Sequence, residues 1–219
     1  NGISMDRLTA GGLSDLAWIH LGLDEVDLAE QHADEAVELR RRIGRPEGIA
    51  HALVARAAVT YHRGDFAGAV TILDEAIELQ QLAGDLDEAE SRVLRCECEV
   101  LLGRREGLAH RLGTAHGLVR ALGDEAQLVR CARVVGMLAE ASERPELCVR
   151  FFAAADHLMR RGGVQLFTPF EDSVHRATVE RARSAMTDET VARQLGQGAE
   201  LSPDDLVIEV DRCLDDLQA

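Results

Sequence analysis

Apolar residues recur with a helical period along most of the chain. Over residues 66–77 they fill positions i, i+3, i+4, i+7, i+10 and i+11, namely Phe66, Ala69, Val70, Leu73, Ala76 and Ile77. This spacing places them on one face of an α-helix. Shifting the pattern by 39 residues and then by 40 replaces Ala69, Leu73 and Ala76 with two further apolar triplets: Leu108, Leu112 and Ala115, then Cys148, Phe152 and Ala155. The pattern therefore predicts a repeated helix whose buried face is kept.

Glycines mark the ends of these helices. The segments DEAVELRRRIG, DEAIELQQLAG, AHGLVRALG and ADHLMRRGG end 40, 39 and 40 residues apart, at Gly44, Gly84, Gly123 and Gly163. Glycine is favoured as a left-handed C-cap because it has no Cβ. A short turn and another apolar helix precede each segment. The sequence therefore predicts an all-α fold with a helix–turn–helix unit repeated four times, which buries its apolar face by stacking.

The unit resembles a tetratricopeptide repeat. RGDFAGAVTILDEAIEL contains the Gly-Asp-aromatic turn, then the small residue Ala69 at the helix crossing, the large residue Leu73 and finally Ala76. The resemblance implies a solenoid, a right-handed α–α superhelix of about four helix pairs. Units of about 40 residues exceed the family's usual length of about 34. They are similar to repeats of bacterial transcription regulators of the MalT-like, LuxR-type ATP-binding and AfsR/SARP types.

The tail breaks this period. Three helix starts are predicted there, at the capping box TPFE (168–171), at Thr187 and at Ser202-Pro203. The first helix is expected to reach about Met186. The second is expected to end at Gly196 or Gly198, and the third at about Leu214. The order of segments from ERPEL to LSPDD is similar to the end of the same regulators. Residues 1–163 are accordingly predicted to be four repeats and residues 164–219 a C-terminal helical cap.

Charge and composition exclude some classes of function. The 24 basic residues, all arginine, face 39 acidic ones, for a net charge of −15. Such a surface repels phosphate backbones, so no direct nucleic-acid binding is predicted for this segment. No apolar run approaches the roughly 20 residues of a membrane helix, so no membrane association is predicted. The five cysteines, at 96, 98, 131, 148 and 213, are interpreted as reduced and mostly buried thiols of a cytoplasmic protein.

Motifs for chemistry are absent from the sequence. A P-loop needs lysine, which the chain lacks, and HExxH, GxSxG, GxGxxG and EF-hand patterns do not occur. Cys96 and Cys98, two positions apart on a helix, point to nearly opposite faces and cannot share a metal ion. None of the eight histidines is placed for a catalytic triad, and His110 and His116 are expected to be partly solvent-facing. The sequence predicts a non-catalytic protein without cofactor or metal.

One basic cluster has two interpretations. Arg40, Arg41, Arg42 and Arg45 could form a docking patch for an acidic partner or a nucleotide. Alternatively, cations in the last turn of a helix complement its macrodipole. The second interpretation is favoured.

The resemblance also implies where a ligand would lie. In such arrays the first helix of each repeat lines a concave groove. In this register the groove residues are Ser14, Trp18, Leu21, His51, Val54, Ala58, Tyr61, Glu90, Val93, Glu97, Val100, Arg130, Arg133, Met137 and Glu140. The candidate contacts are Trp18, His51, Tyr61, Glu97, Arg130, Arg133 and Met137. The alternative for Trp18 and Tyr61 is that they pack between neighbouring helices.

Three functions follow, in decreasing order of support. The resemblance implies a sensor or interaction domain of a transcription regulator. Such a domain binds a small-molecule effector, peptide or protein partner and controls DNA-binding or ATPase domains outside this segment. A stand-alone scaffold for a peptide or protein is the alternative, and an enzyme built on a helical array is the weakest. A homodimer is compatible with the first two. An enclosed apolar pocket would favour the sensor, and an open charged groove the scaffold.

Overall fold

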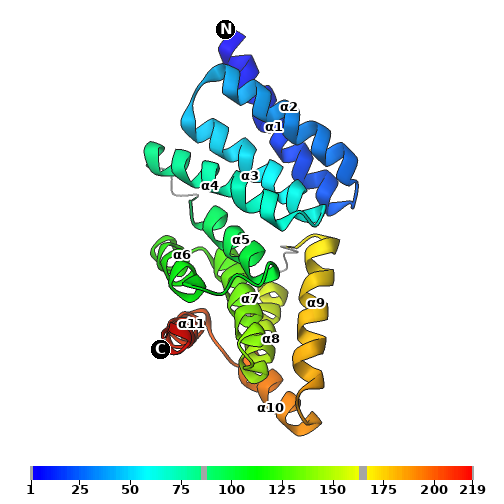
Figure 1. Ribbon diagram of the computed structural model, residues 1–219, viewed down its shortest axis with the longest axis vertical. Helices are drawn as coiled ribbons and strands as arrows, with labels where there is room; N and C mark the ends of the chain where they lie inside the picture. The colour runs from blue at the N-terminus through cyan, green and yellow to red at the C-terminus, as the bar shows by residue number, and fades with distance from the viewer. Residues whose placement is uncertain (1, 85–87, 163–166, 219) are drawn as a thin grey trace. The chain divides into compact units, whose positions relative to one another are not determined.

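The apolar stripes of the sequence fold into helices throughout the part of the chain that the structure describes. The structure is a computed structural model that describes residues 2–84, 88–162 and 167–218, with side chains from residue 5 onward. Within those ranges it contains eleven α-helices and no strand, which confirms the all-α, helical-repeat solenoid (Figure 1). The helices are α1 Gly2–Gly22, α2 Val26–Ile43, α3 Pro46–His62, α4 Phe66–Ala83, α5 Glu88–Leu101, α6 Leu108–Leu122, α7 Glu125–Ala141, α8 Pro145–Gly162, α9 Pro169–Ser184, α10 Asp188–Ala199 and α11 Pro203–Gln218.

The glycine C-caps are confirmed where the structure describes them. Gly44, Gly84 and Gly123 follow α2, α4 and α6 with φ angles of 80°, 66° and 65°. Glycine adopts this left-handed region at little steric cost because it has no Cβ, and each backbone N–H closes the last turn of its helix. The fourth predicted cap, Gly163, lies outside the described residues.

The repeated stripe forms the core, as predicted. Ala69, Leu73 and Ala76 are fully buried on α4. The two shifted triplets on α6 and α8 are buried as well: Leu108, Leu112, Ala115, Cys148, Phe152 and Ala155. One buried face is thus reused on three helices whose outward residues differ.

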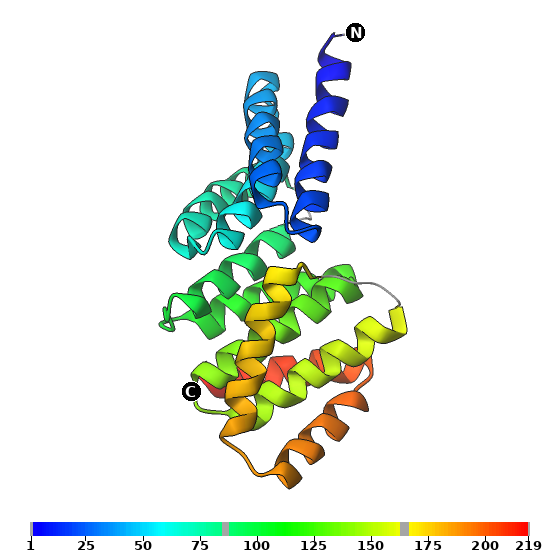
Figure 2. The ribbon, with the colours of Figure 1, turned by 90° about the vertical axis from the view of Figure 1, so that its right-hand side faces the viewer.

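The chain divides into two compact units. Unit 1 comprises Asn1–Ser91 and Phe167–Glu171, and unit 2 comprises Arg92–Leu166 and Asp172–Ala219. In unit 1, α1 packs on α2, α2 on α3 and α3 on α4. In unit 2, α6 packs on α7, α7 on α8, α8 on α10, and α11 on both α6 and α7 (Figures 1 and 2). The division into repeats 1–163 and a cap 164–219 stays a prediction.

The tail begins its helices where the sequence indicates. Thr168 and Glu171 form the reciprocal bonds of a capping box, with N–O distances of 3.2 and 2.7 Å. Thr187 and Ser202 accept hydrogen bonds from the backbone N–H groups of the third residue after each. The predicted ends are less accurate, since α9 stops at Ser184, α10 continues through both of its glycines to Ala199, and α11 extends to Gln218.

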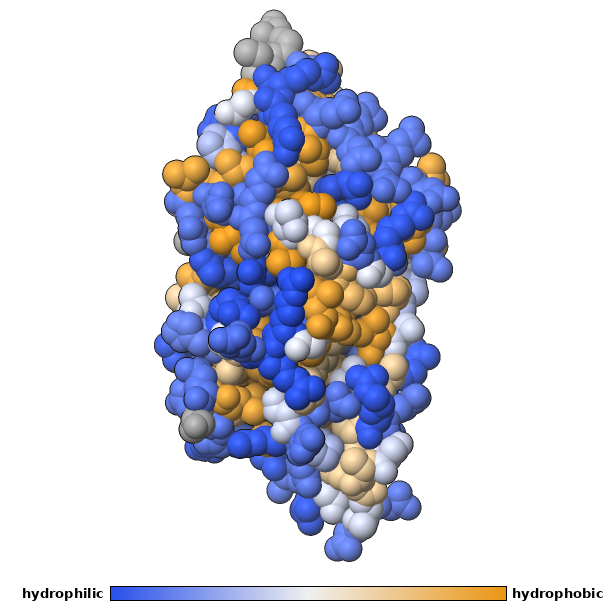
Figure 3. Space-filling model, in the orientation of Figure 1, coloured by the Kyte–Doolittle hydropathy of each residue, from blue (hydrophilic) through white to orange (hydrophobic). Residues whose placement is uncertain are grey.

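One face of the structure is largely polar (Figure 3). On the face drawn in Figure 3, hydrophilic side chains dominate and apolar ones gather in several smaller patches. Among the described residues, no helix combines the length and apolar character needed to cross a membrane.

Candidate functional site

The predicted groove residues of unit 2 are covered by the chain's own helix. Glu97, Arg133 and Met137 lie on α5 and α7, and their exposed fractions are 3%, 5% and 1%. Residues 172–184 of α9 lie beside α7 and α8 in both views of the ribbon (Figures 1 and 2). They contact each of the three residues Glu97, Arg133 and Met137. The fourth candidate of this unit, Arg130, is half-buried on α7.

Charged and polar side chains attach α9 to this face, and three of them, Glu97, Arg133 and His175, are buried. Arg133 donates from Nη2 to Asp156 Oδ1 on α8 at 2.7 Å and from Nη1 to Asp172 Oδ1 on α9 at 3.3 Å. Its Nη1 also lies 2.9 Å from His175 Nδ1, and His175 Nε2 lies 3.1 Å from Glu97 Oε1. We call Glu97, Arg133, Asp156, Asp172 and His175 the polar cluster. Sequence reasoning found two of its five members.

The hydrogen bonds of the polar cluster determine the histidine tautomer. A guanidinium N–H can only donate, so Nδ1 of His175 accepts the bond from Arg133. The imidazole proton is therefore on Nε2, from which it is donated to the buried carboxylate of Glu97. Arg133, His175 and Glu97 thus form one connected chain of hydrogen bonds, so a change at Arg133 also affects the bond between His175 and Glu97.

Apolar and peripheral contacts complete this interface. Met137, Cys148, Val149 and Phe152 form a core cluster with Ala182 of α9. At its edge, Arg181 Nε donates to Glu140 Oε1, another predicted groove residue, at 3.0 Å. Four predicted groove residues, Glu97, Arg133, Met137 and Glu140, therefore contact α9 of the same chain.

The predicted groove residues of unit 1 are placed differently from one another. Trp18 is half-buried and packs against a cluster containing Leu53 and Val54, while His51 is exposed. Tyr61 is 1% exposed, with its ring centroid 5.4 Å from those of Phe66 and Phe170. Trp18 and Tyr61 thus have the interhelical packing that the alternative described, and a role in partner contact stays a prediction for both.

The cysteines are buried and carry no disulfide. All five are free and inaccessible. Burial raises the pKa of Cys96 and Cys148 to about 12 and that of Cys213 to about 11, so these thiols remain protonated and poorly nucleophilic. Within the described ranges, no group of three or more His, Cys, Asp or Glu side chains is placed to hold a metal ion.

One histidine prediction is wrong. His110 is exposed, but His116 is fully buried because α11 covers it. Its Nε2 lies 3.3 Å from Val207 O and 3.4 Å from Asp211 Oδ1. Burial lowers the pKa of His116, and the nearby Asp211 opposes the shift. No pattern in the sequence indicated this contact, because α11 lies outside the repeat.

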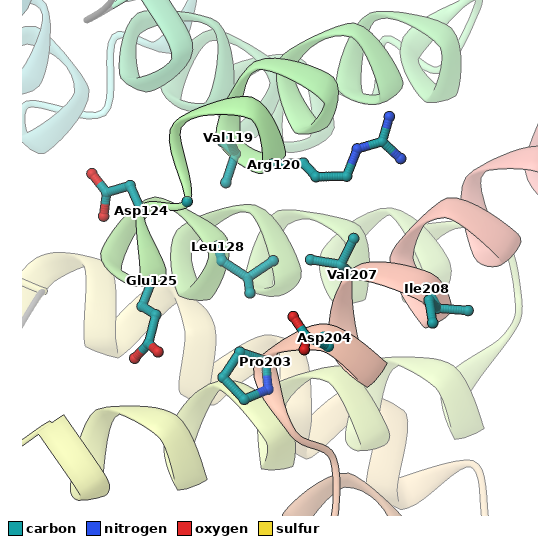
Figure 4. A pocket seen from close by; sticks show the side chains of 10 residues that line it. Val119, Arg120, Asp124, Glu125, Leu128, Pro203, Asp204, Val207 and Ile208 are labelled. Atoms are coloured by element: carbon teal, nitrogen blue, oxygen red, sulfur yellow. The ribbon is translucent and has the colours of Figure 1, made fainter.

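An open pocket lies where α11 meets the end of α6 and the start of α7 (Figure 4). Its volume is about 430 Å³, and we call it the α11 pocket. Its apolar walls include Leu128 and Val207, with Ile208 at the edge 55% exposed. The full lining is Val119, Arg120, Gly123, Asp124, Glu125, Leu128, Pro203, Asp204, Val207 and Ile208.

The rim of the α11 pocket is acidic. Asp124 caps α7 by accepting from the N–H groups of Ala126 and Gln127, at 2.8 and 3.2 Å. Glu125 and Asp204, in the first turns of α7 and α11, make no ion pair with any described residue. The lining cation, Arg120, is bound to Asp211 at 2.9 Å. The rim therefore presents uncompensated negative charge beside apolar surface.

Sequence comparison supports the repeat assignment. Residues 9–43, which contain most of α1 and all of α2, match the family model described as a tetratricopeptide repeat. No curated protein matches the sequence at a significant level. Together with the helical-repeat fold, the match supports a tetratricopeptide-repeat domain, a kind of domain that generally mediates protein–protein interactions.

Proposed function

We propose that this chain is a non-catalytic interaction domain of a bacterial transcription regulator. It binds a protein partner through the α11 pocket and controls DNA-binding or ATPase domains elsewhere in the polypeptide. The resemblance of the tail to such regulators supports its assignment to a transcription regulator. The free, buried thiols support a cytoplasmic location. A stand-alone scaffold is the second candidate, and it would use the same pocket without the attached domains.

The observation that carries the proposal is the difference between two surfaces of unit 2. The groove residues Glu97, Arg133 and Met137 are already covered by α9. The α11 pocket is open, with Ile208 exposed and the carboxylates of Glu125 and Asp204 unpaired among the described residues. A surface that keeps apolar area and unneutralised charge in water gains most from a complementary partner.

The chemistry of the pocket defines that partner. Its volume accommodates one or two large apolar side chains, and its rim favours arginine or lysine on either side of them. Small-molecule sites also occur at this volume. A peptide segment is favoured over an effector because the carboxylates flank the apolar wall at separate helix starts, where flanking cations of an extended or helical segment could meet them.

We expect a fluorescein-labelled peptide Arg-Arg-Leu-Phe-Arg-Arg to bind with a Kd on the order of 0.1 mM by fluorescence anisotropy. Replacing the exposed side chain in Ile208→Ser should weaken binding about fivefold, because apolar contact is lost. The double variant Glu125→Gln/Asp204→Asn should weaken it by a similar factor and reduce its salt dependence.

Matched controls separate this site from the general acidity of the chain. The double variant Glu35→Gln/Glu38→Gln removes the same charge from two exposed residues of unit 1, and affinity should change less than about twofold. Peptides with the apolar pair replaced by serine, or with arginine replaced by glutamate, should not bind. Equal weakening by both double variants would contradict the pocket.

The surface of α1 favours a homodimer. Five apolar side chains on one side of α1 and just after its C-terminal end have exposed fractions of 39–72%. They are Met5, Leu8, Leu16, Ile19 and Leu23. We expect light scattering after gel filtration to give twice the 23.9 kDa mass of the chain. The variant Leu8→Gln/Ile19→Gln should return it to the monomer mass. A monomer mass for the unaltered chain at all concentrations would exclude the dimer.

A further inference from the structure

Arg40 differs from the other arginines of its cluster. Arg41 pairs with Glu75 at 2.9 Å, and Arg45 pairs with Glu47. Arg40 makes no ion pair and no hydrogen bond to any residue that the structure describes, and its Nε is buried without a partner. The macrodipole of α2 accounts for cations in this turn, but it does not account for a buried, unpaired nitrogen.

Two glycines leave the space that Arg40 occupies. A Cβ at Gly48 of α3 would lie 3.1 Å from Arg40 Cδ and 3.2 Å from its Nη1. A Cβ at Gly11 of α1 would lie 3.4 Å from its Nη2. The side chain is therefore held between two helices, close to both backbones, in a position that a larger residue at 48 would disturb. We call this position the Arg40 slot.

Electrostatics oppose a cation in the slot. Burial lowers the pKa of Arg40, and the positive charge of Arg7 lowers it further, while Glu47 raises it. Glu47 is itself bound to Arg45. A partly desolvated guanidinium beside other cations costs free energy unless an anion is bound to it. The slot therefore holds a cation that lacks an anionic partner among the described residues.

The slot opens into a cavity of about 730 Å³ in unit 1. The cavity lining is basic, although the net charge of the chain is −15. The cations lie around the first turn of α3. The lining residues are Arg40, Arg45, Pro46, Glu47, Gly48, His51, Leu82 and Ala83. The exposed His51, a predicted groove residue, thus lies in the same cavity as the unpaired arginine.

We propose that this cavity binds an oxyanion, a phosphate or carboxylate group, with Arg40 as its principal ligand. The planar guanidinium matches two oxygens of such a group, which a single point charge does not. The site shares no residue with the α11 pocket, so it stands or falls separately from the proposed function.

The test follows the arginine Nε–H resonances of the ¹⁵N-labelled chain during addition of sodium phosphate at constant ionic strength. We expect one resonance, absent from Arg40→Gln, to shift saturably with a midpoint of about 1–10 mM. Arg40→Gln should weaken phosphate binding about tenfold or more, because it removes charge-assisted hydrogen bonds. No saturable shift up to the solubility limit of phosphate would overturn the proposal.

Two further variants test the geometry. Arg42→Gln removes the same charge from an exposed residue of the same turn and should change the midpoint less than about twofold. Gly48→Ala retains a helical residue but crowds the slot, and it should weaken binding about threefold or more. Equal effects of Arg40→Gln and Arg42→Gln would contradict a specific site. Sodium acetate in a parallel titration tells whether carboxylates bind as well as phosphate.

Discussion

Gly198→Ala is expected to lower the free energy of unfolding by about 2–3 kcal/mol. Gly198 is buried where α10 crosses α8. An added Cβ would lie 2.3 Å from Arg150 O, 2.8 Å from Ala153 Cβ and 3.1 Å from Ala154 N. Two of these atoms belong to the backbone of α8, so the helices must separate. That movement also strains the hydrogen bond from Arg150 Nε to Gln194 Oε1, 2.8 Å long.

The same helix provides the control. Gly196 lies two residues earlier, is exposed and has nothing within 4 Å of an added Cβ. Gly196→Ala should stabilise the chain by about 0.5 kcal/mol, because alanine loses less backbone entropy in a helix. Urea unfolding followed by far-UV circular dichroism measures both variants. Trp18, the sole tryptophan, reports unit 1 as a reference. Similar shifts for the two variants would rule out the close helix crossing.

Arg133→Leu is expected to lower the free energy of unfolding by about 3 kcal/mol, toward the lower end of the range for a broken buried ion pair. The loss is moderated because Asp156 and Asp172 are 45% and 34% exposed and can regain water. His175 is buried and cannot regain water in this way. It also loses the Arg133 N–H that donates to its Nδ1, and this bond keeps the imidazole proton on Nε2, facing Glu97. Arg133→Lys should recover part of the loss, since one ammonium cannot match the guanidinium fork.

Arg176→Leu is the matched control for this prediction. Arg176 lies on α9 beside the polar cluster, is exposed and makes no ion pair with the described residues. Its replacement should change stability by no more than about 0.5 kcal/mol. Urea unfolding of both variants, and hydrogen exchange of residues 172–184, should show that only Arg133→Leu loosens α9. Unchanged exchange there would mean that the polar cluster does not hold the helix.

Local features of the sequence predicted much of the fold. A positive φ at Gly84 and the capping box at Thr168 depend on neighbouring residues alone. The buried positions of α4, α6 and α8 follow from a 39- or 40-residue shift, because each repeat packs in the same way. Helix ends in the tail were less accurate, since Gly196 and Gly198 have the composition of a stop but are helical.

Contacts outside the repeat could not be predicted. Glu97 and His175 are 78 residues apart, and no periodic pattern relates them. The repeat register placed Glu97, Arg133 and Met137 on the predicted groove, but it could not show that α9 covers them. The α11 pocket and the burial of His116 likewise depend on where a tail helix packs. The sequence places Ile208 shortly after the acidic residues Asp204 and Asp205, but its exposure is seen only in the structure.

The tail therefore has two roles in this account. Residues 172–184 cover the predicted groove residues of α5 and α7, which we call the inner face of unit 2. Helix α11 creates a new surface together with α6 and α7. A partner bound at that surface would touch the start of α7, the helix that carries Arg133.

Hydrogen–deuterium exchange of the chain with and without the peptide Arg-Arg-Leu-Phe-Arg-Arg tests the central claim most directly. We predict slower exchange in three segments that line the α11 pocket: the end of α6, the start of α7 and the first turns of α11. Residues 172–184 should remain protected, because the peptide does not replace them. Faster exchange in residues 172–184, with new protection confined to α5 and the middle of α7, would contradict the account. It would instead place the partner on the inner face in exchange for α9.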